Sequence, residues 1–546
     1  MSMYIKKIHI ENFKKFKGCF DLDLNDDLNI IVGDNESGKS TILEAIYLAL
    51  TGVFRGKYLR NELSPYIFNK EIVDEFLKSV REGQAQTPPK VLIELYFEGE
   101  DLPGVFRGKN NSFISDSCGV AFSIELNDKY KPEYEATLRE LNNIKSLPIE
   151  YYDIEWFSFA WDPITSKSIP CKAAFIDSDG GKLPNGSDIY INRIIKDNMD
   201  TSDVVKITQA FRGIQDDFSS NDSVTDINKN IKETSKITNK EIGISVDLSS
   251  RNAWESFLMT YLDDIPYTYI GKGEQAIVKT NLALGNKTAS NAGVVLMEEP
   301  ENHLSHTKMH ELLSYIRQHC SGKQVIISTH SSFVANKLGL SKLLLLNGAK
   351  KLRLSDLSKE TESYFESLPG YNTLRLLLCK KAVLVEGPSD ELIVQRAYID
   401  INGKSPIDDG IDIISAYNLS FLHFLEIADK LSLTVSVVTD NDGDIAALKN
   451  KYALYANKPN IKICYDDTVD SAPSEIDGKS YNCNTLEPKL LKENSLSEFN
   501  AIFGTGYPDD VQMLKYMKNN KTECALAIFK SQSKINYPHY ILNAIQ

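Results

Sequence analysis

Residues 33–41 read GDNESGKST, and this stretch limits the folds open to the chain more than any other. It fits the spacing GxxxxGK[ST] from Gly33 to Ser40, follows the apolar run LNIIV and opens the segment TILEAIYLAL, which carries an apolar stripe. A strand, a glycine-rich turn and a helix in this order cradle phosphate groups, because backbone N–H groups and the helix N-terminus face them. We therefore expect an α/β domain that binds nucleotide.

Later segments supply the other groups that such a site needs. The apolar strand VVLM ends in Glu298 and Glu299, and the next strand, QVIIST, ends at His330. Glu298 would assist Mg²⁺ and Glu299 would polarise the attacking water, while the alternative is two solvated acids at a strand end. Lys39 would reach the outer phosphates and Ser40 would bind Mg²⁺. The expected nucleotide-site residues are Gly33, Asn35, Gly38, Lys39, Ser40, Thr41, Glu298, Glu299 and His330.

Two more strands end in carboxylates. In AVLVEGPSDE the apolar run stops at Glu386 and Asp390 follows, and in SVVTDNDGD the run stops before Asp440 and Asp442. Ligands gather at the carboxyl ends of strands in an open parallel sheet. Asp390 lies one helical turn from Glu386, and Asp442 points the same way as Asp440 if the segment is extended. Asp444 lies beyond this pair, and we expect it to be peripheral.

Four carboxylates in one cleft repel one another and need cations. All-oxygen ligands favour Mg²⁺ or Mn²⁺ over zinc, and such ions can position a phosphodiester and activate water. The alternative is a loop of surface acids, which is common in a chain with 75 acidic residues.

The chain has 546 residues, enough for two or three domains, and a net charge of −14. That charge argues against a surface that binds nucleic acid by charge alone, but allows a local basic groove or nucleic acid held through metal ions.

The eight cysteines show no CxxC spacing, so we expect no zinc site, no disulfide framework and a reduced cytoplasm. No apolar run approaches the roughly 20 residues that span a bilayer, and we expect no membrane partner.

The order of segments predicts two domains, residues 1–378 and 379–546. The polar stretch at about 195–250 is expected to be a helical insertion, either a partner-contacting arm or a plain solvated one, and residues 349–375 are expected to be irregular. Beyond 378 the pattern predicts a second, smaller α/β unit. Its strands are expected at 382–385, 411–414 and 434–438, with helices at 389–400 and 419–431.

The first set of motifs resembles the ABC-type ATPases of the RecF and SMC branch. Lys39 and Ser40 match Walker A, Glu298 and Glu299 match Walker B, and His330 matches the switch histidine. The resemblance implies ATP as cofactor and a dimer, because a signature motif from a second subunit completes the site. The candidate is IGKGEQA, with Gly271, Gly273, Glu274 and Gln275. Lys272 departs from the usual Ser-Gly-Gly-Gln pattern, which favours slow hydrolysis.

The second set resembles the Toprim domain, and a Toprim domain behind an ABC-type head resembles the OLD family of ATP-linked endonucleases over essentially the whole chain. This broad group includes the Gabija nuclease and certain retron effectors. The resemblance implies DNA cleavage with Mg²⁺ or Mn²⁺ at Glu386, Asp390, Asp440 and Asp442, supported by Glu487. It also implies a lysine at the scissile phosphate, for which Lys534 is preferred over Lys530.

The same resemblance implies an anti-phage role, a homo-oligomer and a partner such as a helicase-like protein or a retron reverse transcriptase with its RNA–DNA product. Two other functions remain open. One is a nucleotide-switched scaffold that binds DNA without cutting it, and the other is a RecF-like repair ATPase. A strand-passing tyrosine also remains possible among the 26 tyrosines.

Overall fold

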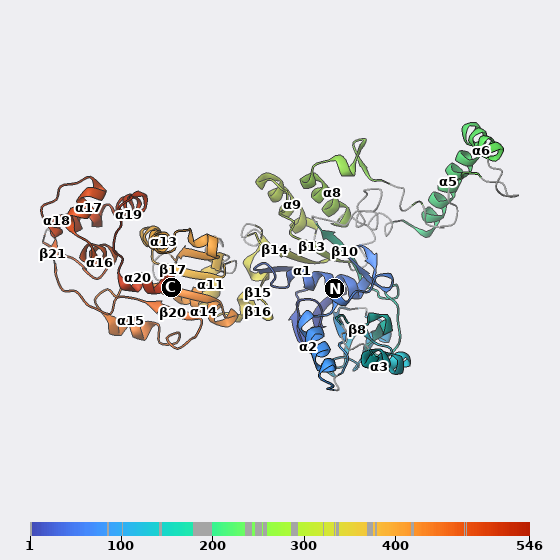
Figure 1. Cartoon of the computed structure of the whole chain (residues 1–546), viewed down its shortest axis with the longest axis horizontal. Coiled ribbons are helices and arrows are strands. Elements are labelled where there is room, and N and C mark those ends of the chain that lie inside the picture. The colour runs from blue at the N-terminus through green and yellow to red at the C-terminus, as the bar shows by residue number, and fades with distance from the viewer. Residues whose placement is uncertain are drawn as a thin grey trace. The chain divides into compact units, whose positions relative to one another are not determined.

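The computed structural model describes most of the chain as two compact units (Figure 1). One unit comprises residues 1–29 and 40–328, and the other comprises residues 30–39 and 329–546. The predicted domain boundary at residue 378 stays a prediction. Residues 3–546 are described except for 85–86, 101, 141–144, 178–198, 235–242, 246–253, 255–258, 285–292, 320–321, 332–333, 335–337, 368–374, 377–378, 417–419, 474 and 477.

An antiparallel sheet forms one part of the first unit, in the order β2-β1-β6-β8-β7 with β9 beside β8. Ile8 and Ile10 of its strand β1 are fully buried, because alternate residues of a strand share a face. The strands of this sheet are β1 Tyr4–Glu11, β2 Cys19–Asp23, β6 Val91–Glu98, β7 Arg107–Gly108, β8 Ser117–Leu126 and β9 Tyr152–Ser158.

Parallel strands form the other part of this unit. Strand β13 (Gly293–Glu298) lies between β10 (Lys172–Asp177) and β14 (Gln324–Thr329). Residues 294–297 and 325–327 are all buried, the continuous apolar pattern of strands covered on both faces. The expected strands VVLM and QVIIST are therefore confirmed.

Helices and short hairpins complete the first unit. Helices α5 and α6 fall in the expected insertion, of which residues 195–198, 235–242 and 246–250 lie outside the described residues. The helices are α1 Lys39–Thr51, α2 Lys70–Arg81, α3 Lys131–Glu140, α5 Thr201–Ser219, α6 Asp222–Thr234, α8 Lys272–Leu284 and α9 His306–His319. The hairpins are β4 Val53–Phe54 with β5 Lys57–Tyr58, and β11 Tyr261–Leu262 with β12 Ile265–Pro266.

In the second unit, residues 30–33 of β3 (Leu28–Gly33) run parallel to β15 (Leu343–Asn347), which forms a hairpin with β16 (Lys350–Arg353). Helix α11 follows at Lys359–Ser367. The expectation that residues 349–375 are irregular was therefore wrong for these segments. Strand β16 has the sequence KKLR, and a charged edge strand of this kind lacks the apolar alternation by which buried strands are recognised.

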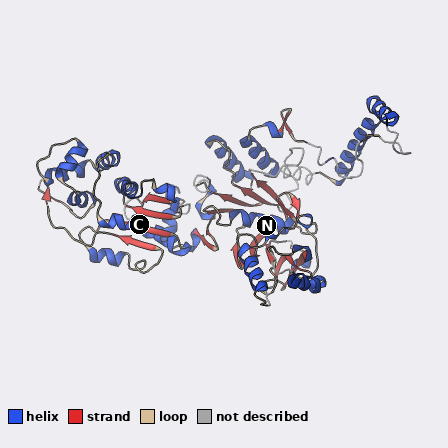
Figure 2. Ribbon diagram, in the orientation of Figure 1, coloured by secondary structure: helices blue, strands red, loops and turns tan. Residues whose placement is uncertain are grey.

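A four-stranded parallel sheet follows, in the order β18-β17-β19-β20. Figure 2 shows its strands flanked by helices. The chain moves from β17 to β18 through α13, and then from β18 back across to β19 through α14. Because such crossovers are right-handed, α13 and α14 cover opposite faces. The expected strands and helices here are confirmed: β17 Lys381–Val385, α13 Pro388–Asn402, β18 Ile411–Ser415, α14 Phe421–Leu431 and β19 Thr434–Val438.

The remaining elements surround this sheet. Helix α13 packs against α19 and α20. None of the helices in the described part of the chain is long and apolar enough to cross a membrane. These last elements are α15 Ile445–Lys451, β20 Ile461–Cys464, β21 Glu475–Ile476, β22 Lys479–Ser480, α16 Leu486–Glu493, α17 Leu496–Phe503, α18 Asp510–Asn519, α19 Lys521–Lys530 and α20 His539–Ile545.

Candidate functional site

The carboxyl ends of β17 and β19 mark the point where the strand order reverses. From β17 the chain goes to β18 on one side, and β19 lies on the other side of β17. Helices leave such a point in opposite directions, which opens a crevice where ligands bind. Glu386 follows β17 directly and Asp440 lies two residues beyond β19. The strand order therefore brings these two predicted carboxylates to the same crevice.

Glu386 and Asp440 are joined by hydrogen bonds. The Thr439 hydroxyl donates to Glu386 Oε1 at 2.7 Å, and the Asp440 backbone N–H donates to the same oxygen at 3.0 Å. Burial raises the pKa of the Asp440 carboxyl well above its usual range, and the charges of Glu386, Asp390, Glu487 and Asp442 raise it further. This crowding of negative charge is the main electrostatic feature of the site.

Asp390 enters the crevice from the first turn of α13. Its carboxylate accepts a hydrogen bond from the Gly387 N–H at 3.1 Å, which caps the helix. Burial, followed by the charges of Glu386 and Glu487, raises the pKa of Asp390 from 3.8 to about 7, and the charge of Lys521 opposes this shift. A carboxyl group of this kind holds a proton near neutral pH unless a cation replaces it.

Asp442 does not follow the extended path that the sequence suggested. Its φ is +48°, so the chain turns there, and its exposed carboxylate accepts a hydrogen bond from Asn482 Nδ2 at 2.8 Å. The turn arises because Asn441 points inward. Its side-chain N–H donates to the carbonyls of Asp466 and Thr468 at 2.6 and 2.8 Å. Asp442 still contributes to the negative charge at Asp440, but from a turn.

Glu487 lies in the first turn of α16 and is only 5% exposed. Lys521, the first residue of α19, places its ammonium 3.2 Å from Glu487 Oε1. The charges of Glu487, Asp440 and Asp390 all raise the pKa of Lys521 against the effect of burial. Sequence reasoning missed Lys521, because no strand end or local motif marks it.

Two other groups near the carboxylates were also missed. Burial lowers the pKa of Lys451, while the charges of Glu386 and Asp442 raise it. Burial raises the pKa of the Tyr540 hydroxyl, and the charges of Asp440 and Asp390 add to the effect. The predicted lysines, Lys530 and Lys534, are both exposed. The choice of Lys534 stays a prediction.

Among the residues that the structure describes, no three of the Toprim-type carboxylates bring their oxygens within 4.8 Å of one another. Asp444 accepts a hydrogen bond from Ala447 N at 2.9 Å as the N-cap of α15, in line with a peripheral place. The arrangement is an acid-lined crevice that could hold hard cations and a bridging phosphate.

The glycine-rich loop is closely packed around Gly33 and Lys39. Gly38 has a φ of +102°, and a Cβ on Gly33 would lie 2.4 Å from the Leu346 carbonyl oxygen. Both positions therefore need glycine. Lys39 is 5% exposed, and its ammonium donates to the carbonyls of Gly33 and Asp34 at 2.8 and 2.9 Å. His330 Nδ1 lies 3.3 Å from Lys39 Nζ, so these two predicted residues are neighbours.

Glu298 ends β13, and Glu299 begins a turn with a φ of +44°. The Glu299 N–H donates to the Ser328 carbonyl of β14 at 2.9 Å, and its carboxylate accepts from Asn302 Nδ2 at 2.9 Å. Glu299 is therefore held at the strand end by one backbone and one side-chain hydrogen bond. Ser40 and Thr41 lie in the first turn of α1, and Asn35 lies in the loop before it.

The candidate signature motif lies at the start of α8, which begins at Lys272. Gln275 Nε2 donates to the carbonyls of Tyr267 and Ile270, each at 2.9 Å. Lys272 Nζ lies 3.3 Å from His303 Nε2. The residue that departs from the usual motif therefore contacts the loop that follows Glu298 and Glu299.

Three protein-family models match parts of the chain. Residues 7–151 match a model described as an AAA domain, and residues 178–336 match "AAA domain, putative AbiEii toxin, Type IV TA system". Residues 377–442 match "Overcoming lysogenization defect protein-like, TOPRIM domain". Together with the strand orders, these matches confirm the predicted fold class, an ABC-type ATPase domain followed by a Toprim α/β domain.

The chain is similar to "Endonuclease GajA" of Bacillus cereus (strain VD045), with 21% identity over 577 residues that cover 98% of this chain and 93% of that protein. It is also similar to "Retron Ec83 probable ATPase" of Escherichia coli, with 22% identity over 64% of this chain and 72% of that protein. A solved Smc head domain from Pyrococcus furiosus covers 66% of this chain and 99% of its own, with 12% identity and a TM-score of 0.34.

Proposed function

We propose that this chain, an OLD-family protein that joins an ABC-type ATPase to a Toprim domain, is a metal-dependent DNA endonuclease whose ATP site regulates cleavage. The observation that carries the proposal is the convergence of Glu386, Asp390, Asp440 and Glu487 at the switch point of one parallel sheet. The name of a relative that aligns with 98% of the chain, an endonuclease, supports it.

The residues at this crevice fit Mg²⁺ or Mn²⁺. Their donors are carboxylate oxygens, which hard cations prefer, and the raised pKa values of Asp390 and Asp440 reflect negative charge that a cation would neutralise. Glu386, Asp390, Asp440 and Asp442 would hold the ions. Bound there, divalent ions supply a Lewis acid for the scissile phosphate and lower the pKa of a water.

Other residues of the chain orient and balance these ligands. The Thr439 hydroxyl and the Asp440 N–H fix one oxygen of Glu386, which leaves its second oxygen for a ligand. Lys521 pairs with Glu487, and its ammonium places positive charge beside the acids. A cation at this position can also attract a DNA phosphate. The reaction class that fits is hydrolysis of a phosphodiester by water.

The nucleotide site would have a separate task. Lys39, Ser40 and His330 would hold the phosphates and Mg²⁺ of ATP, and Glu298 and Glu299 would assist the metal and the water. A second copy of the chain would supply the segment around Gly271. A role in anti-phage defence is supported by the retron origin in the name of one relative.

The test is cleavage of supercoiled plasmid by the purified full chain with Mg²⁺ or Mn²⁺, with and without ATP. We expect the wild type to nick or linearise DNA, Asp440→Asn to lose cleavage, and Lys39→Ala to lose only the response to ATP. Asp444→Asn is the matched control, because it changes an acid of the same loop and asparagine still caps a helix.

Cleavage that persists in Asp440→Asn would overturn the proposal. A wild type that binds DNA but cuts it with neither metal would instead support the nucleotide-switched scaffold. The departure of Lys272 from the usual signature pattern favours slow ATP turnover, which suits that alternative.

A further inference from the structure

A second group of possible metal ligands lies on the hairpin formed by the first two strands. His9 of β1 lies directly across from Asp21 of β2, and Glu11 lies directly across from Cys19. Residues two apart in a strand share a face, and cross-strand partners lie side by side. The antiparallel register therefore gathers these four side chains on one face of the sheet, while Ile8 and Ile10 are buried on the other.

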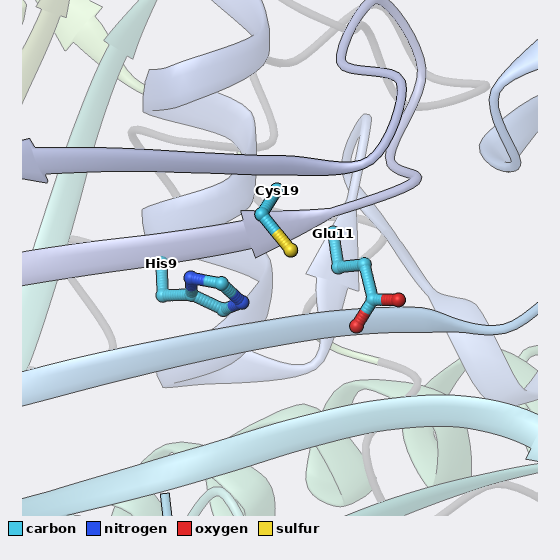
Figure 3. Close-up of side chains that lie close together, drawn as sticks. All are labelled: His9, Glu11 and Cys19. Atoms are coloured by element: carbon cyan, nitrogen blue, oxygen red, sulfur yellow. The ribbon is translucent and has the colours of Figure 1, made fainter. Parts of the chain in front are cut away.

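Three of the four side chains point toward a shared space (Figure 3). One ligand atom each from His9, Glu11 and Cys19 lies within 4.8 Å of the other two. His9 is 4% exposed, whereas Cys19 is exposed. The group therefore has a buried anchor and an open side from which an ion can enter.

The contacts of His9 favour metal binding through its outer nitrogen. Asp21 Oδ1 lies 2.7 Å from His9 Nδ1, and the ring of Phe113 packs edge-on against the imidazole. A carboxylate on one ring nitrogen fixes the tautomer and makes the other nitrogen a better ligand, an arrangement common in zinc sites. Nε2 is the nitrogen left for a metal.

We infer that His9, Glu11 and Cys19 form a binding site for a zinc-type divalent ion, separate from the acid-lined crevice. Zinc binds imidazole nitrogen, carboxylate oxygen and thiolate sulfur, and zinc sites with three protein ligands keep a fourth position for water. Thiolate and imidazole disfavour Mg²⁺ and Ca²⁺. The absence of CxxC spacing excludes cysteine-rich sites, but not a site with one cysteine whose ligands come from two paired strands.

The charges around the group support a cation. The carboxylates of Glu11 and Asp21 both lie close enough to the Cys19 thiol to act on it electrostatically. Lys90 has a half-exposed side chain, and its ammonium lies 3.8 Å from Glu11 Oε2. A pair of this kind contributes little in water. A divalent ion would neutralise the group more completely and hold Cys19 as thiolate.

The experiment titrates the full chain, freed of metal, with Co²⁺ and records the thiolate-to-cobalt absorption in the near ultraviolet. We expect a band that saturates at one ion per chain and that disappears when Zn²⁺ displaces cobalt. Cys19→Ser should abolish the band, and Cys379→Ser should keep it. Cys19 is exposed, so its substitution leaves the fold intact, which a thermal melt checks.

A wild type without the band, or a band that survives Cys19→Ser, would overturn the inference. Asp21→Asn gives a second readout, because it removes the carboxylate that orients His9 but no ligand. Its Zn²⁺ affinity, measured by competition with a chromophoric chelator, should fall roughly 10–100-fold. An unchanged affinity would mean that His9 is not oriented for a metal.

Discussion

At the scale of single residues, the acid-lined crevice holds carboxyl groups whose charged forms are unfavourable. Asp390 and Asp440 are partly accessible to solvent, yet the surrounding protein and the neighbouring acids raise both pKa values. Buried like charges destabilise a fold until a proton or a cation neutralises them. The crevice should therefore bind a metal more weakly wherever protons compete for the same carboxylates.

The first prediction concerns pH. The pKa of Asp390 is about 7 in the folded chain and about 3.8 when unperturbed. Between these values the folded chain keeps a proton that the unfolded chain has lost, so the free energy of unfolding falls as pH rises. Without metal, thermal melts should show this loss, and Mg²⁺ should reverse it above pH 7. Each kcal/mol regained corresponds to about 2–4 °C.

Asp390→Asn removes the ionisable group, so its melts should depend less on both pH and Mg²⁺. Asp444→Asn should behave as the wild type, because Asp444 caps α15 outside the crevice. If Asp390→Asn keeps the full Mg²⁺ response above pH 7, Asp390 is not a metal ligand.

The second prediction compares three lysines. Lys521→Met removes the ammonium beside Glu487, so plasmid cleavage should fall roughly tenfold or more, equivalent to about 1.4 kcal/mol. Lys521→Arg should restore part of the rate, since it restores the charge. Lys530→Met and Lys534→Met are the matched comparisons, as both lysines are exposed. Loss of cleavage in Lys534→Met alone would favour the residue chosen from the sequence.

Sequence patterns could place the strand-end acids, because an apolar run that stops at a carboxylate marks the edge of a buried strand. They could not place Lys521. It lies at the start of a helix, far from Asp440 in the chain, and only the packing of α19 against α13 brings it to the crevice. The same holds for Tyr540, whose position follows from the packing of α20 on β19 and β20.

At the scale of elements, two of the sequence-based predictions failed at turns. Gly348 and Ala349 connect β15 to β16, and Gly348 has a φ of +59°. A two-residue loop with glycine at its first position is one of the preferred hairpin turns, so this hairpin could have been found despite the charged sequence of β16. The turn at Asp442 was harder to foresee, because it depends on the distant carbonyls that Asn441 reaches.

The third prediction tests the contact between the phosphate-binding loop and β15. In Gly33→Ala the new Cβ would lie 2.4 Å from the Leu346 carbonyl oxygen and 2.7 Å from Ser37 Oγ. Relieving the clash must shift backbone, which costs about 1–3 kcal/mol, so both the melting temperature and the affinity for a fluorescent ATP analogue should fall. Gly104→Ala is the control, because its Cβ would meet nothing within 4 Å. Equal behaviour of the two variants would contradict the tight packing at Gly33.

At the scale of the whole molecule, the net charge of −14 opposes the binding of DNA, whose phosphates are also negative. If metal ions bridge the carboxylates to the phosphates, DNA binding should depend on them. The fourth prediction is that fluorescence anisotropy shows DNA binding with Ca²⁺, loss of binding with EDTA, and only a shallow dependence on salt. Tight binding in EDTA with a steep salt dependence would instead reveal a basic groove, because each phosphate neutralised by lysine or arginine releases counterions.

The hydrogen bond from the Asp440 backbone N–H to Glu386 Oε1 has a further consequence. A main-chain amide that donates to a carboxylate senses the charge on that carboxylate, so its proton resonance should move when an ion or a proton arrives. With selective ¹⁵N labelling of aspartate, this one amide would act as a spectroscopic probe inside the crevice. It would follow ion occupancy directly, without DNA and without turnover.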